Sequence, residues 1–200
     1  MTINENYIQM RNFISLLIFI TLPTLSSFSQ DDDFKTIFNG KIERISGFGG
    51  PIYSYTIIDN RFSMMTGGGG AVLLNDFFIG GFGVSTVSGV KYNANTTINL
   101  GYGGLWYGYS YKGNSPIHPS FQLRTGWGII KSNSNGNVVI DDNIFVVEPC
   151  VEAEFNVAKF FRIAVGGSYR IVGGLDQGHL TTGNMSGPAA IIVFRFGWFK

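Results

Sequence analysis

The segment FVVEPCVEAEFNVAKFFRIAVGGSYRI, residues 145–171, has the clearest periodicity in this chain. Apolar and polar residues alternate along it on both sides of the segment Asn156–Lys159, which is the pattern of two β-strands joined by a tight turn. Every second residue of the two strands, counted from Phe145 to Phe155 and from Phe161 to Ile171, is uncharged. The other set holds Glu148, Glu152, Glu154, Arg162 and Arg170. Because successive side chains of a strand point to opposite faces, each strand has one apolar face and one charged face.

The same two faces continue into the neighbouring segments 117–130 and 187–199. With these segments added, the charged face carries Arg124, Glu148, Glu152, Glu154, Arg162, Arg170 and Arg195. Acidic and basic groups are nearly balanced, which predicts a structural network of ion pairs in a confined interior, where an unpaired charge is costly. The opposite face carries no charge, as expected of a wall against lipid, where an outward Arg or Lys at mid-bilayer costs about 2–4 kcal/mol.

Alternation and turn signals divide the chain from Ile45 onward into eight candidate strands. These are residues 45–57, 62–74, 77–88, 97–111, 117–130, 143–156, 160–172 and 187–199. Short connections (75–76, 112–116 and 156–159) alternate with long ones (89–96, 131–142 and 173–186), and only the first hairpin, 58–61, departs from this order. Long strands with alternating connections predict an all-β fold, a closed antiparallel up-and-down transmembrane β-barrel of about eight strands. Pro149 lacks a backbone donor, so we expect a β-bulge there.

Composition favours a membrane wall over a soluble barrel or sandwich. Charged residues are 14% of the chain, against roughly 25% in soluble domains. Lysines fall in the predicted connections, the N-terminal region or the last position: Lys35, Lys41, Lys91, Lys112, Lys131, Lys159 and Lys200. Aromatic residues gather beside the short connections, as they do at a membrane–water interface: Phe77, Phe78, Tyr109, Tyr111, Phe121, Phe155, Phe160, Phe161, Trp198 and Phe199.

The N-terminal region predicts export from the cytoplasm. Arg11 precedes an apolar run at 13–22, and Ser27-Phe28-Ser29 supplies the small residues of a cleavage site before Gln30. The run is too short for a membrane-spanning helix, which needs about 20 apolar residues. We therefore expect a signal peptide at 1–29, a polar lead-in segment at 30–44 and the barrel domain at 45–200, placed in the cell outer membrane.

Three segments carry a family resemblance. They are Val146–Tyr169, GGGGAVLLNDFFIGGFG at 67–83 and LGYGGLWYGY at 100–109. They resemble uncharacterised small outer-membrane β-barrel proteins of Gram-negative bacteria, and their general form is similar to the eight-stranded OmpA-type and OmpX-type barrels. The resemblance implies the fold and the compartment but no activity. Such barrels usually end on an aromatic residue that the assembly machinery reads, whereas here Phe199 is followed by Lys200.

Some segments could carry chemistry, but each has a structural explanation that we prefer. His118-Pro119-Ser120 places a base and a hydroxyl on one strand face, although it also fits a strand start. The glutamates at 148, 152 and 154 could act as acid–base groups or metal ligands, but the arginines on their face favour ion pairs. Gly67–Gly70 lacks the Lys-Ser/Thr of a phosphate loop, and Cys150 fits a small inward filler. His179 lies alone in a predicted long connection.

We therefore expect a non-enzymatic outer-membrane protein that serves surface interaction or envelope integrity through its long connections. Its expected partners are outer-membrane lipids and the outer-membrane assembly machinery, and we expect a monomer with no cofactor or metal. The net charge of +1 provides no basic patch for nucleic acid. Two alternatives stay open, a lipid-modifying outer-membrane enzyme and a periplasmic β-barrel that binds a ligand. An eight-stranded barrel is normally filled by its own side chains, which argues against passage of bulky solutes.

Overall fold

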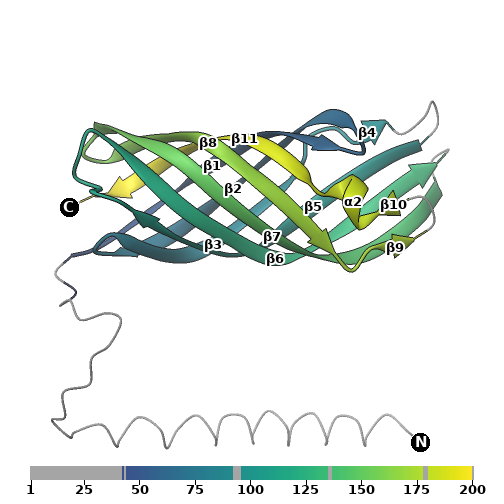
Figure 1. The fold of residues 1–200 in the computed structure, drawn as a ribbon, viewed down its shortest axis with the longest axis horizontal. Helices are drawn as coiled ribbons and strands as arrows, with labels where there is room; N and C mark the ends of the chain where they lie inside the picture. Colours follow the sequence, from purple (N-terminus) through teal and green to yellow (C-terminus); the bar gives the residue numbers. More distant parts are fainter. Residues whose placement is uncertain (1–41, 43, 92–95, 135–136, 178–179, 200) are drawn as a thin grey trace, which may run out of the picture. The chain divides into compact units, whose positions relative to one another are not determined.

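Eight long antiparallel strands close into a barrel in the computed structural model, which describes residues 42, 44–91, 96–134, 137–177 and 180–199 (Figure 1). They are β1 (Ile45–Ile58), β2 (Arg61–Leu74), β3 (Phe77–Thr86), β5 (Thr96–Ser110), β6 (Ile117–Ser134), β7 (Asn137–Ala158), β8 (Phe161–Gly173) and β11 (Gly187–Trp198). Each pairs with the next along the chain, and β11 pairs with β1 to close the sheet. The predicted fold class is confirmed. The signal peptide and most of the lead-in segment lie outside the described residues.

Four short elements lie at one end of the barrel. β4 (Val90–Lys91) adds two residues beside β5, and β9 (Asp176–Gln177) pairs with β10 (Leu180–Thr181). The single-turn helix α2 (Thr182–Met185) follows and precedes β11. Among the described residues, no helix is long and apolar enough to cross a bilayer.

The connections define two rims. The start of β1 and the end of β11 meet at one rim, where Gly47 pairs with Trp198, and we call this end the short-turn rim. The opposite end, which carries β4, β9, β10 and α2, is the long-connection rim. The β1–β2 turn at that rim is short because Asp59 and Asn60 both take left-handed backbone conformations, with φ of 49° and 59°. Such two-residue turns match the twist of antiparallel strands.

The predicted long connection at 131–142 is wrong. β6 continues to Ser134 and β7 begins at Asn137, so most of this segment, including Lys131, is strand. The run 138–140 is β-branched, which favours extended backbone. Pairing of β7 with β8 starts only at Phe145 and Gly173. The β6–β7 hairpin therefore extends beyond the last pairing of β7 with β8.

Pro149 does not cause the bulge that we predicted. Val147 pairs with Ile171 and Cys150 pairs with Ser168, so the β7–β8 register is continuous across the proline. Pro149 removes one backbone donor without adding a residue to the strand. The register shifts instead between Asn156 and Ala158, beside the turn to β8.

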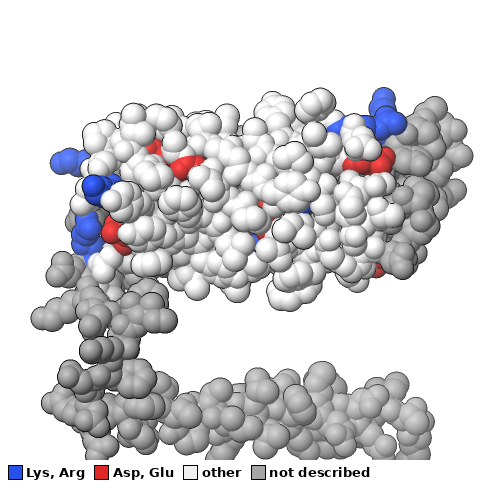
Figure 2. All heavy atoms as spheres, viewed as in Figure 1, with Lys and Arg blue, Asp and Glu red and all other residues white. Residues whose placement is uncertain are grey.

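The predicted division into an apolar wall and a charged interior is confirmed for the last four strands. Side chains such as Trp127, Val151 and Ile192 are exposed on the wall, and Figure 2 shows charged side chains gathered mainly toward the two ends. Two residues of the predicted aromatic belt are exceptions, because Phe78 and Phe199 point inward, where both contact Phe48. Alternation explains this, since each directly follows an outward aromatic residue in its strand or at its end.

Candidate functional site

All seven charged residues singled out from the sequence lie inside the barrel. Their exposed fractions are 0% to 2%, except for 6% at Arg162. They come from β6 (Arg124), β7 (Glu148, Glu152 and Glu154), β8 (Arg162 and Arg170) and β11 (Arg195). The structure gathers six of them into one ion-pair network and sets Arg170 apart.

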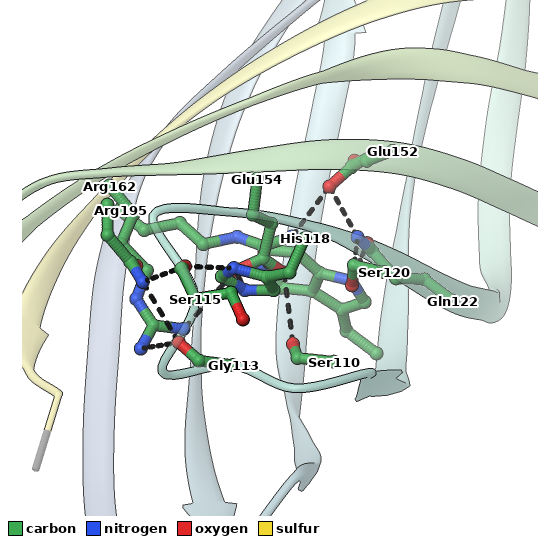
Figure 3. Close-up of polar contacts among 12 residues, drawn as sticks. Ser110, Gly113, Ser115, His118, Ser120, Gln122, Glu152, Glu154, Arg162 and Arg195 are labelled. Carbon is green, nitrogen blue, oxygen red and sulfur yellow. Dashed lines mark hydrogen bonds and ion pairs between the residues drawn. The ribbon is translucent and has the colours of Figure 1, made fainter.

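Glu154 is the centre of the part of the network that lies nearest to the short-turn rim (Figure 3). Arg195 Nη1 donates to its Oε1, and Arg162 Nη1 donates to its Oε2 over 3.3 Å. Ser110 Oγ donates to Oε1 over 3.0 Å, and His118 Nε2 lies 3.2 Å from Oε2. Arg162 reaches Glu154 diagonally, because its direct partner in the ladder is Asn156. One carboxylate thus compensates two guanidinium groups.

Glu152 lies one step deeper on the same face of β7. Arg195 Nη2 donates to its Oε2 over 2.7 Å, and Gln122 Nε2 donates to the same oxygen. Arg124 Nη2 lies 3.6 Å from Oε1. Arg195 therefore bridges Glu152 and Glu154, which fixes the spacing of the two carboxylates.

Glu148 is the third and deepest carboxylate. Tyr102 Oη donates to it over 3.0 Å from β5, and Ser168 Oγ donates over 2.6 Å from β8. Arg124 Nη1 is 3.7 Å from its Oε2. The three glutamates are therefore all compensated, as expected for charges removed from water.

Arg170 does not join the network. Its Nε donates to the Met185 carbonyl over 2.9 Å, and its Nη2 donates to the Ile57 carbonyl over 3.1 Å. These carbonyls belong to α2 and to the end of β1, two segments remote in sequence. Arg170 thereby ties α2 to the barrel at the long-connection rim. Sequence alternation located its face but could not identify these backbone partners.

Aromatic rings from the first strands cover the arginines of the last ones. The Arg195 guanidinium carbon is 4.9 Å from the ring centroid of Phe48, 5.5 Å from that of Phe78 and 5.4 Å from that of Trp106. Arg124 lies 5.3 Å from the Trp106 centroid. Trp106 Nε1 also donates to Gln122 Oε1 over 2.8 Å. Our sequence analysis missed this cluster, although inward alternation of these residues was the signal for it.

Aliphatic side chains fill the lumen toward the long-connection rim. Fully buried examples at 0% exposure are Ile52, Ile58, Met65, Ile98, Ile130 and Met185. Met185 comes from α2, so this helix contributes one buried side chain at that end. Charged, aromatic and aliphatic side chains together leave the described interior packed, in agreement with the small strand number.

The two catalytic candidates, His118 and Ser120, are buried inside the barrel and hydrogen-bonded there. His118 Nδ1 is 3.0 Å from the Ser115 carbonyl, and its Nε2 is engaged by Glu154. Ser120 is fully buried and its Oγ accepts from Gln122 Nε2 over 3.3 Å. The structure therefore places neither group where a substrate can reach it. Within the described residues, no group of three His, Cys, Asp or Glu could hold a metal ion. Gly67–Gly70 lies inside β2, and His179 lies outside the described residues.

Comparison with known proteins identifies the class to which this architecture conforms. No protein-family model matches the chain, and a search of curated proteins finds no significant match. Among solved structures, Neisserial surface protein A is similar over 76% of this chain and 96% of its own, with a TM-score of 0.62 and 12% identity. Ail, the attachment invasion locus protein of Yersinia pestis, is similar over 77% of this chain and 96% of its own, with a TM-score of 0.50 and 17% identity.

Both neighbours are small eight-stranded outer-membrane β-barrels. The chain has this fold, with an all-β closed antiparallel barrel of the OmpA and OmpX form. At these identities the likeness concerns the fold alone.

Proposed function

We propose that this protein resides in the cell outer membrane as a monomer and contacts molecules outside the cell through its long-connection rim, without catalysing a reaction. The apolar wall supports the location, because it presents side chains that lipid can cover. The compensated and packed interior supports a non-enzymatic role. Two similar barrels are named a surface protein and an attachment invasion locus protein, which makes attachment the form of contact to test first.

The observation that carries this proposal is the edge of β7 at 137–144, beside which the described residues form no ladder. β6 pairs with β7 as far as Ser134 and Asn137, whereas the ladder between β7 and β8 stops at Phe145. Among the described residues, no ladder covers the other edge of β7 at 137–144. An uncovered strand edge is a template for pairing with an extended segment of another protein.

Epitope tags in intact cells test the orientation. One tag is inserted after Asn135, in the β6–β7 connection, and the other after Lys159, in the β7–β8 turn. The turn after β5 is less suitable, because its Gly113 carbonyl accepts bonds from Asn156 and Arg162. We expect surface labelling of the first tag only. Labelling of the second alone would invert the topology, and recovery in the soluble periplasmic fraction would favour the ligand-binding alternative.

A shortened hairpin tests the role itself. Residues 132–140 are replaced by Asn-Gly, which joins Lys131 to its direct ladder partner Asp141 through a two-residue turn. We expect expressing bacteria to lose adhesion to glass coated with extracellular-matrix proteins, while the purified barrel keeps its resistance to unfolding in detergent. Equal adhesion with the full and the shortened hairpin contradicts a role for the edge. Absence of adhesion with the full hairpin, relative to cells without the protein, contradicts attachment.

The outer-membrane assembly machinery stays a proposed partner. The outward aromatic at the end of β11 is Trp198, which is 73% exposed, whereas Phe199 turns inward over Arg162. We therefore expect recognition of this end to depend on Trp198 more than on Phe199.

A further inference from the structure

The β5–β6 turn, residues 111–116, folds toward the lumen at the short-turn rim. Gly113 is buried in this turn, and Figure 3 shows Gly113 and Ser115 beside Arg162 and His118. The cavity that Gly113 and Arg162 share has a volume of only about 10 Å³, which is roughly the space that one water molecule requires. The turn therefore packs against the interior network rather than projecting from the rim.

Two backbone carbonyls of the turn are held by side chains from three strands of the barrel. The Gly113 carbonyl accepts from Asn156 Nδ2 over 3.0 Å and from Arg162 Nη2 over 3.2 Å. The Ser115 carbonyl accepts from the same Asn156 nitrogen over 2.7 Å and contacts His118 Nδ1 at 3.0 Å. Among these three side chains, only the imidazole is of a type that changes its charge near neutral pH. Its contact is therefore the part of this fastening that a proton can control.

Both ring nitrogens of His118 face oxygen atoms that accept hydrogen bonds and have no proton to donate. Nδ1 is 3.0 Å from the Ser115 carbonyl oxygen, and Nε2 is 3.2 Å from Glu154 Oε2. A neutral imidazole has a single N–H, and its other nitrogen is itself an acceptor. Glu154 does not supply the second proton, because the guanidinium groups of Arg162 and Arg195 contact it and keep it ionised. The two contacts therefore require a proton on each nitrogen of His118.

We propose that His118 is an imidazolium that fastens the β5–β6 turn, and that loss of its Nδ1 proton to solvent loosens the turn. The remaining proton stays on Nε2, because the Glu154 carboxylate is a stronger acceptor than a carbonyl oxygen. The lone pair of Nδ1 then faces the Ser115 carbonyl oxygen at hydrogen-bond distance, and the two repel each other. The turn is therefore fastened at lower pH and loosened as the pH rises. This device lies at the short-turn rim and is independent of the function proposed for the opposite rim.

Acidic and basic side chains surround His118 and the turn. They are Glu154 and Glu152 on β7, Arg162 on β8, Arg195 on β11, Arg124 on β6, Asp76 between β2 and β3, Arg44 before β1 and Lys112 in the turn itself. Arg162 and Arg195 share the Glu154 carboxylate with His118, so their charge opposes a third cation beside it. Two hydrogen bonds hold the second proton on the imidazole against this repulsion. A rise in pH can therefore remove it while the ion pairs of Glu154 with the arginines remain.

Nitrogen NMR of the imidazole tests its charge. The chain without its expected signal peptide is folded in detergent micelles with ¹⁵N-labelled histidine, and His179→Gln leaves His118 as the one histidine of the chain. An unperturbed imidazole is a cation in about one quarter of molecules at pH 7. We expect instead that both ring nitrogens of His118 carry protons at this pH in nearly all molecules. A single protonated nitrogen at pH 7 overturns the proposal.

Amide hydrogen exchange tests the fastening of the turn. The reporter is the Asn156 amide, which donates to the Pro116 carbonyl over 2.8 Å, and the control is the Gly197 amide, which donates to the Phe160 carbonyl over 2.9 Å at the same rim. Protection is measured at about pH 6 and about pH 9, on either side of the usual range of an imidazole, and corrected for the intrinsic exchange rate. We expect Asn156 to lose protection by about tenfold or more, the effect of one hydrogen bond to a charged group, while Gly197 is unchanged. Equal losses at the two amides overturn the proposal.

Variants assign the pH dependence to His118. His118→Gln keeps an amide donor that does not titrate, so the protection of Asn156 should be the same at both pH values, whereas the control His179→Gln should keep the pH dependence. His118→Leu offers no donor, so Asn156 should be weakly protected at both. Glu154 retains its two arginines in each variant, so the barrel should still fold. A pH-dependent loss of protection that persists in His118→Gln belongs to another group and overturns the proposal.

Discussion

The two halves of the barrel fill the interior with different kinds of side chain. The first half, β1, β2, β3 and β5, turns aromatic and aliphatic side chains inward and has much of its wall built from glycine. The second half, β6, β7, β8 and β11, turns arginines and glutamates inward and has a bulky apolar wall. Arg195 shows how they meet, because carboxylates of β7 hold its guanidinium while rings of β1, β3 and β5 cover it. Neither half could bury its own interior alone.

The largest expected effect comes from leaving the second half with uncompensated charge. Glu154→Met removes the carboxylate that Arg162, Arg195 and His118 share. We expect the free energy of unfolding in detergent, measured by urea titration, to fall by about 5 kcal/mol. The double variant Glu154→Met with Arg195→Met should recover part of this loss, because one stranded cation is removed. A double variant no more stable than the single one contradicts the pairing.

Truncation of a buried aromatic side chain in the first half tests whether its rings stabilise the arginines of the second half. Trp106→Ala removes contacts to Phe48, Phe78 and two guanidinium groups. We expect a loss of about 4 kcal/mol in the same titration, typical of a buried Trp replaced by Ala. Trp127→Ala, on the exposed wall, is the control and should change stability by less than about 1 kcal/mol in detergent. Similar losses for the two would show that the inward cluster contributes nothing specific.

Glycines distinguish inward positions from wall positions in both halves, since an added Cβ would also lie 1.9 Å from a carbonyl oxygen at Gly80 on β3 and no closer than 3.6 Å to any atom at Gly167 on β8. A Cβ at Gly166 on β8 would lie 2.0 Å from the Val151 carbonyl oxygen, whereas at Gly83 on β3 it would meet open space. We expect Gly166→Ala to cost about 2–3 kcal/mol through backbone displacement, and Gly83→Ala to be close to neutral. The midpoints of heat-induced unfolding on gels provide the measurement. The reverse order would mean that the close approach at Gly166 is relieved without cost.

The smallest of these effects is expected at the edge of the ion-pair network. Arg162→Met removes one donor from Glu154, which keeps Arg195, His118 and Ser110 as partners. We expect a loss of about 1.5–2 kcal/mol, the contribution of a hydrogen bond to a charged group. Lys159→Met, at an exposed turn of the same rim, is the control and should be neutral. An unchanged unfolding midpoint for Arg162→Met would remove Arg162 from the network.

Side-chain alternation and turn residues located the eight strands, and the period of two assigned each strand residue to the wall or to the interior. Strand order follows as well, since short turns join neighbours and a meander closes by pairing its first and last strands. The prediction was weakest at 131–142, where polar residues suggested a loop. There the ladder with the neighbouring strand holds the backbone extended past Lys131, which local composition does not reveal.

Alternation along the strands is enough to assign these charges to the interior. Their near balance is expected as well, because burial of an unpaired charge is costly anywhere in a narrow lumen. The assembled barrel sets which of these charges contact each other. It placed Arg195 between two glutamates and under rings from three strands, and it turned Arg170 to the carbonyls of Ile57 and Met185. It also aligned the glycines of β3 and β5 beside Trp127. These choices depend on how far each strand is staggered against its neighbours, which is set by the closure of the whole sheet rather than by any one strand.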